Sequence, residues 1–141
     1  MGDLLGYDFS SSPQPHRLAR PCIWYLLMTL SEKQRLFCRL TAQLITWSYA
    51  NGYELTFGEA YRTQLQAEDN AKKGIGLAKS NHCIRLAIDL NLFLDGKYRT
   101  DSAAYKALGD YWRTLNPLCR WGGDFKKPDG CHFSLEHNGV R

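Results

Sequence analysis

The 141-residue chain lacks long apolar runs and blocks of like charge. No apolar stretch approaches the ~20 residues that a membrane-spanning helix requires, so we expect no stable membrane insertion. The net charge of +4 is spread along the chain without five like charges in a row. This distribution is not typical of a nucleic-acid-binding arm, and we expect no nucleic-acid partner. The length corresponds to one domain with one hydrophobic core.

Cysteine is too scarce for a disulfide scaffold. The chain has five cysteines, an odd number, and they form no Cys-x-x-Cys pair. Small disulfide-stapled proteins have a much higher density of cysteine in regular spacings. We therefore interpret the cysteines as reduced thiols of a protein made in the cytosol. They are Cys22, Cys38, Cys83, Cys119 and Cys131.

The N-terminal part has no hydrophobic periodicity. Residues 1–20 are rich in Ser, Pro and Gly, which predicts disorder or a loosely docked tail. The apolar segment 21–30 lacks an Ala-x-Ala-like cleavage site, so we do not interpret it as a signal peptide. Met28 precedes a helix-cap pattern and resembles the start of a domain. We predict an N-terminal extension over residues 1–27 and a folded domain over residues 28–141.

Within that domain, helical and alternating apolar patterns follow one another. Ser31 followed by Gln34 resembles a capping box, and helical spacing continues as far as Asn51. Ser102 is a plausible cap of a later helix. The predicted helices cover residues 31–50, about 64–72 and 102–115, and the predicted strands cover residues 53–63, 86–93 and 131–136. This order predicts a small α+β domain in which helices flank a mostly antiparallel sheet.

Asp89 lies within the apolar strand 86–93, where a buried carboxylate would require a positive partner. Alternation places Asp89 on the face opposite the apolar residues, and His132 has the corresponding position in the last strand. His82 lies on the loop that enters the strand. If the two strands are close, these three side chains converge in an open cleft. Two imidazoles and a carboxylate are a usual ligand set for catalytic zinc, whose charge compensates the aspartate.

The spacing of these three residues is also compatible with a simpler interpretation, in which they bind no metal. A histidine near a strand is often structural, and an aspartate on the solvent face of an amphipathic strand needs no metal. Cys83 and Cys131 adjoin the two histidines and compete as thiolate ligands. Alternation directs each cysteine away from its neighbouring histidine, so we predict that both are small core residues.

Three separated motifs resemble the LAS-type zinc peptidases. This family includes D-alanyl-D-alanine carboxypeptidases and phage endolysins that cleave between L-alanine and D-glutamate. The first motif, residues 80–89, matches the pattern SxHxxGxAxD, except that Arg85 stands at the glycine position. The second is Asp129-x-x-His132, after the WGGDF stretch of residues 121–125, and the third is residues 61–66. The resemblance covers residues 30–137. The departure at Arg85 concerns the shape of this loop and not the identity of the ligands.

The resemblance implies a zinc site and a general base. It assigns the Zn²⁺ ligands as His82, Asp89 and His132. It assigns Asp129 as the base that takes a proton from the attacking water and delivers it to the leaving amine. Glu136 and Asp124 are the alternative carboxylates, and a further role for Asp124 is to brace its loop.

Three further residues are implied in substrate binding. Arg62 would bind a substrate carboxylate or stabilise the developing oxyanion, and the alternative is a surface salt bridge. Ser80 would hydrogen-bond the substrate or brace His82. Gln66 would orient Arg62 or the substrate.

These features predict a phage-type endolysin that cleaves the L-alanyl-D-glutamate bond of peptidoglycan stem peptides. We expect a monomer that remains in the host bacterial cytoplasm until the inner membrane is permeabilised. A D,D-carboxypeptidase that removes terminal D-alanine is the second interpretation. A non-catalytic zinc or cell-wall binding module is the third.

Overall fold

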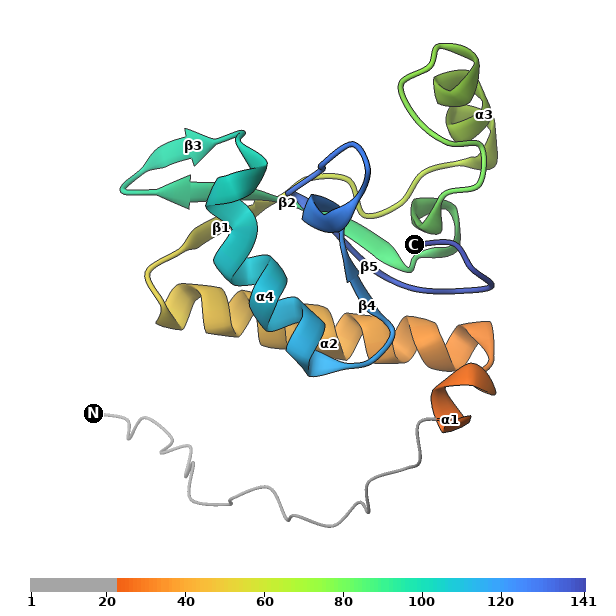
Figure 1. Cartoon of the computed structure of the whole chain (residues 1–141), viewed down its shortest axis with the longest axis horizontal. Helices are drawn as coiled ribbons and strands as arrows, with labels where there is room; N and C mark the ends of the chain where they lie inside the picture. The colour runs from red at the N-terminus through yellow and green to blue at the C-terminus, as the bar shows by residue number, and fades with distance from the viewer. Residues whose placement is uncertain (1–22) are drawn as a thin grey trace, which may run out of the picture.

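The computed structural model describes residues 23–141, and an antiparallel sheet is its framework (Figure 1). The strand order is β1-β2-β5-β4, and β3 also pairs with β2. All described pairs are antiparallel, which confirms the predicted α+β fold. The strands are β1 (Glu54–Phe57), β2 (Ala87–Leu94), β3 (Lys97–Arg99), β4 (Cys119–Trp121) and β5 (His132–Leu135).

Two helices, α2 (Leu30–Ala50) and α4 (Lys106–Leu115), cover one face of the sheet (Figure 1). Trp112 of α4 is fully buried, and its ring makes edge-on contacts with Phe37 and Phe133 at centroid distances of 5.9 and 6.0 Å. Its Nε1 donates to two backbone carbonyls, so burial leaves no polar atom unpaired. No helix within residues 23–141 is long and apolar enough to cross a membrane.

The start of the domain differs in detail from the prediction. Helix α2 is capped by Thr29, whose side chain accepts from the Glu32 amide while Glu32 reaches back to Thr29. The predicted cap at Ser31 is therefore wrong, and Ser31 lies inside the helix. A short helix, α1 (Ile23–Leu26), precedes α2, and Tyr25 packs against the core. Residues 1–22 lie outside the described residues, so the predicted boundary at Met28 stays a prediction.

The predicted strand 53–63 is wrong beyond Phe57. The Gly58 amide donates to the Asp89 carbonyl at 2.8 Å, and the Asp89 amide donates to the Glu59 carbonyl at 2.9 Å. Two consecutive residues thus face one residue of β2, which bends the chain out of the ladder. Residues 58–63 lead to α3 (Gln64–Lys72), which was predicted with these bounds and stands apart from the sheet in Figure 1.

The predicted helix 102–115 is two elements. A 3₁₀ turn, η2 (Ser102–Tyr105), precedes α4, and its cap is Asp101 rather than Ser102. Asp101 accepts the Ala104 amide, whereas the Ser102 hydroxyl accepts the Gly130 amide at 2.9 Å. Strands β3 and β4 were not predicted because three residues are too few for an alternating pattern to be visible.

Candidate metal centre

Asp89 and His132 meet across neighbouring strands on the sheet face opposite α2 and α4. In the ladder of β2 and β5, Asp89 is the direct partner of His132, and Ala87 is the partner of Ser134. Directly opposed residues of an antiparallel pair place their side chains side by side. Asp89 Oδ1 lies 3.2 Å from His132 Nδ1.

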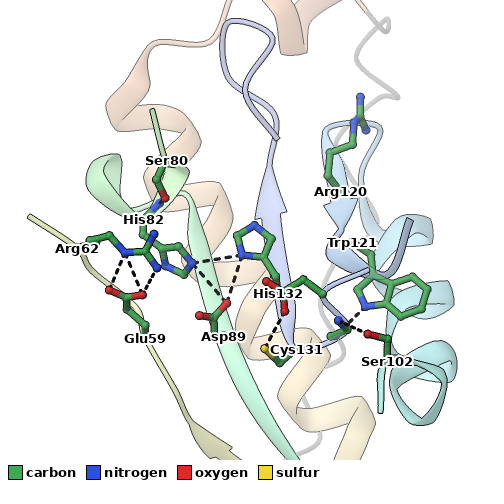
Figure 2. Close-up of polar contacts among 12 residues, drawn as sticks. Glu59, Arg62, Ser80, His82, Asp89, Ser102, Arg120, Trp121, Cys131 and His132 are labelled. Carbon is green, nitrogen blue, oxygen red and sulfur yellow. Dashed lines mark hydrogen bonds and ion pairs between the residues drawn. The ribbon is translucent and has the colours of Figure 1, made fainter. Parts of the chain in front are cut away.

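His82 joins them from η1 (Asn81–Ile84), the 3₁₀ turn that enters β2. Ser80 caps this turn, and its Oγ accepts the His82 amide at 3.3 Å. His82 Nε2 lies 3.2 Å from His132 Nδ1 and 3.4 Å from Asp89 Oδ1 (Figure 2). The predicted convergence of the three side chains is therefore present, and Ser80 braces the backbone of His82.

Arg85 ends η1 in the left-handed conformation, with φ of 55°. This is the conformation that glycine adopts without strain, and a residue with a Cβ pays about 1–2 kcal/mol for it. The Arg85 guanidinium lies 4.2 Å from the centroid of the Tyr61 ring, a cation–π contact. The loop thus keeps a glycine-like turn although the glycine is replaced.

The three facing atoms fit a zinc ion. Tetrahedral coordination with metal–ligand bonds of 2.0–2.2 Å gives ligand–ligand separations of about 3.4 Å. The observed separations are 3.2, 3.2 and 3.4 Å. Hydrogen bonds alone would satisfy the three atoms poorly, because one proton on His132 Nδ1 can be directed to only one of its two neighbours. A shared cation satisfies all three.

Electrostatics favour a cation at the same place. Burial raises the pKa of Asp89, but hydrogen bonds from His132 and His82 outweigh it and hold the pKa well below its usual value. The carboxylate is therefore ionised at neutral pH. His82 and His132 are 2% and 8% exposed, whereas Asp89 is only partly buried, so solvent reaches the group on the side of Asp89.

Trp121 anchors the loop before β5. Its Nε1 donates to the Gly130 carbonyl at 2.8 Å, and the Gly130 amide donates to Ser102 (Figure 2). A Cβ at Gly109 or Gly123 would lie 2.1 or 2.3 Å from the Trp121 ring. Glycine at both positions therefore lets the indole fit closely and hold this loop.

Asp129 lies in that loop beside His132. Its amide donates to the Gly122 carbonyl at 2.9 Å, and its carbonyl accepts the His132 amide at 3.2 Å. A Cβ on Gly122 would lie 2.2 Å from the Asp129 carbonyl oxygen and 2.8 Å from His132 Cβ. The exposed Asp129 carboxylate accepts the Cys131 thiol at 3.2 Å. Burial and this bond raise the pKa of Cys131 to about 12, so the thiol keeps its proton.

The alternative carboxylates have arginine partners. Asp124 pairs with Arg113 at 2.8 Å, and Glu136 accepts from Arg120 Nε at 2.9 Å. Among the ion pairs within residues 23–141, Asp129 has no cationic partner. In this respect Asp129 differs from both alternative carboxylates.

Glu59 is a residue near the site that sequence analysis missed. Its carboxylate pairs with Arg62 through Nε, at 3.0 and 3.1 Å, and through Nη2 (Figure 2). The hydrogen bond from Glu59 is the main cause that raises the pKa of Arg62, and Asp89 adds to it through charge. A salt bridge, the alternative considered for Arg62, is therefore present, but it is partly buried rather than on the surface. The three-residue spacing of Glu59 and Arg62 was the available signal.

The side chains of Gln66 and Cys83 have hydrogen-bond partners outside the group of candidate ligands. Gln66 is exposed, and its side-chain amide donates to Asn70 at 2.8 Å rather than to a residue of the candidate site. Cys83 is partly buried, with its thiol 3.8 Å from the Thr63 carbonyl, and lies outside the core cluster. The prediction of Cys83 as a core residue is wrong, whereas Cys131 does pack against the core.

Comparisons with known proteins agree with this geometry. Residues 74–135 match the family model described as D-alanyl-D-alanine carboxypeptidase, and this segment contains all three candidate ligands and Asp129. The structure resembles that of the L-Ala D-Glu endopeptidase ChiX of Serratia marcescens, with a TM-score of 0.59 and 20% identity. The likeness covers 75% of this chain and 85% of ChiX and supports the fold. No curated protein matches the sequence. These findings support the resemblance of the chain to the LAS-type zinc peptidases, a family of peptidoglycan-acting hydrolases.

Proposed function

We propose that this peptidase is a phage-type endolysin that cleaves the L-alanyl-D-glutamate bond of peptidoglycan stem peptides. The observation that carries the peptidase chemistry is the convergence of His82, Asp89 and His132, with Asp129 in the adjoining loop, where its carbonyl accepts the His132 amide. The likeness of the fold to an L-Ala D-Glu endopeptidase supports the choice of bond.

The three ligands would hold a zinc ion, which polarises a carbonyl and lowers the pKa of a bound water when present. Asp129 accepts the proton of the attacking water and returns it to the leaving amine. Arg62 offers its guanidinium, held by Glu59, to a carboxylate of the D-glutamyl side or to the developing oxyanion. Ser80 braces His82 or hydrogen-bonds the substrate, and Gln66 orients the substrate or Arg62.

The proposed setting is the lysis of a host bacterium. The protein accumulates in the host cytoplasm as a monomer and reaches the wall once the inner membrane is permeabilised. Its spread positive charge of +4 suits a polyanionic wall.

A D,D-carboxypeptidase is the second candidate, and the description of the matching family model favours it. Digestion of purified peptidoglycan by the zinc-loaded protein, followed by mass spectrometry of the products, separates the two. New amino-terminal D-glutamate supports the endopeptidase, whereas released D-alanine rejects it in favour of the carboxypeptidase.

The same digestion tests the non-catalytic alternative. A protein that sediments with the wall but generates no new termini would be a zinc or wall-binding module. The position of Asp129 beside His132 argues against that outcome, because a binding module needs no general base.

A further inference from the structure

The sheet face that carries Asp89 continues along β2 beyond the candidate metal centre. Asn91 and Phe93 follow Asp89 at two-residue intervals and therefore lie on the same face. Across the ladder, Asn91 pairs with Thr56 of β1, and Phe93 pairs with Tyr98 of β3. None of these four side chains belongs to the core cluster of the described residues.

These side chains form an ordered polar and aromatic surface. The Asn91 amide donates to Thr56 Oγ1 at 3.1 Å, and the Tyr98 hydroxyl donates to Asn91 Oδ1 at 3.4 Å. The rings of Phe93 and Tyr98 lie 5.4 Å apart, and Tyr98 is 54% exposed. An exposed aromatic ring beside an oriented amide matches a sugar, which has an apolar ring face and a polar rim.

The direction in which this surface extends from the candidate metal centre indicates which part of the substrate it would contact. The Arg62 amide donates to the His82 carbonyl, so Arg62 lies beside the η1 end of β2, while Asn91 and Phe93 lie toward the opposite end. If Arg62 receives a carboxylate of the D-glutamyl side, the amino-terminal side of the scissile bond extends toward Asn91. In peptidoglycan that side is L-alanine, joined by an amide to the lactyl group of muramic acid.

The distances along β2 agree with the lengths of the substrate units that would lie on it. Asn91 lies about 7 Å along the strand from Asp89, and Phe93 about 14 Å. An extended alanyl unit and a lactyl unit of similar length together span about 7 Å. The sugar ring that follows would then lie over Asn91 and reach the rings of Phe93 and Tyr98.

We propose that Asn91, Phe93 and Tyr98 form a subsite for the N-acetylmuramyl residue that precedes the scissile alanyl bond. This subsite rests on the proposed endopeptidase function. It would favour stem peptides that are still attached to the glycan strand over free peptides.

The test compares two substrates with the full zinc-loaded chain. One is an N-acetylmuramyl pentapeptide, and the other is the same pentapeptide with an acetylated amino terminus. We expect kcat/KM for the muramyl substrate to exceed that for the acetyl substrate by about fivefold, the size of one aromatic contact. Tyr98→Ala and Asn91→Ala are each expected to bring this ratio close to one.

Phe57→Ala is the matched control. Phe57 is an exposed aromatic residue of β1, but it pairs with the core-facing Leu90 and so lies on the other sheet face. This variant should keep the wild-type ratio. Tyr98→Leu, which keeps apolar bulk without a ring, replaces Tyr98→Ala if the alanine variant does not fold.

The outcomes separate the two proposals. Equal cleavage of both substrates by the wild-type chain, or an unchanged ratio in folded Tyr98 and Asn91 variants, rejects the subsite and leaves the endopeptidase intact. Cleavage of neither substrate between L-alanine and D-glutamate rejects the endopeptidase, and the subsite with it.

Discussion

Asp89 and His132 are direct partners in the ladder of β2 and β5, with Oδ1 and Nδ1 3.2 Å apart. Backbone hydrogen bonds on both strands therefore set the distance between these two candidate ligands. His82 depends instead on the 3₁₀ turn that Ser80 caps and Arg85 ends. Two of the three positions are held by the sheet, and the third is held by a loop.

Removing a ligand should remove the zinc. Asp89→Ala or His82→Ala is expected to lower zinc affinity by more than about 100-fold, because the loss of an outer-shell partner already costs up to about that much. Equilibrium dialysis with metal analysis measures this directly. His137→Ala is the control, since His137 contacts Lys33 and lies outside the candidate ligand group. Equal zinc content in all variants would refute the assigned ligands.

Asp129→Ala should separate metal binding from catalysis. We expect zinc content to be unchanged and kcat on peptidoglycan to fall by about 100-fold to 10,000-fold, the range of general-base catalysis. Asp124→Ala, which removes a carboxylate paired with Arg113, should change kcat by no more than a few-fold. Normal lysis by Asp129→Ala would reject the assigned base.

Gly122→Ala should disturb the loop that holds Asp129 and His132. The added Cβ would lie 2.2 Å from the Asp129 carbonyl oxygen, so the backbone must shift. We expect a loss of about 1–3 kcal/mol in the free energy of unfolding, together with weaker zinc binding. Denaturant titration measures the first and dialysis the second.

Gly76→Ala is the comparison for that variant. Its added Cβ would lie 3.3 Å from Asn70 Cβ and 3.9 Å from Arg62 Nη1, both on side chains, and no left-handed φ is involved. It should change stability by less than about 1 kcal/mol. Similar effects of the two substitutions would mean that close packing at Gly122 is unimportant.

Arg85 allows a test of backbone strain. Arg85→Gly and Arg85→Ala both lose the contact with Tyr61, but only alanine keeps a Cβ at φ of 55°. We expect the glycine variant to be more stable than the alanine variant by about 1 kcal/mol. Denaturant unfolding of both variants in the same metal state measures the difference. Greater stability of the alanine variant would show that this turn does not carry the strain.

Local sequence pattern was sufficient for the main elements near the site. Alternation along residues 86–93 placed Asp89 on the face opposite Leu90, because a strand has a period of two residues whatever surrounds it. The bounds of α3 were also predicted from the sequence, and the structure shows that Thr63, the residue before it, caps this helix. The short strands β3 and β4 were invisible because three residues show no period.

At several positions the local sequence pattern did not identify the hydrogen-bond partner that the folded structure shows. Ser31 resembled a helix cap, but Thr29 caps α2, and Glu32 completes its capping box. Ser102 resembled a helix cap, but its hydroxyl accepts a hydrogen bond from the amide of Gly130, 28 residues away. The pairing of Arg62 with Glu59 beside Asp89 likewise required the bend at Gly58.

The identities of the three candidate ligands were readable from motifs, but their common point in space was not. His82 and His132 are 50 positions apart in the sequence, and nothing in the local pattern sets the register that opposes Asp89 to His132. That register depends on packing Phe133 and Leu90 into one core, because a slip by one residue would turn His132 away from Asp89. Residue chemistry is local, whereas the distance between ligands is a property of the folded sheet.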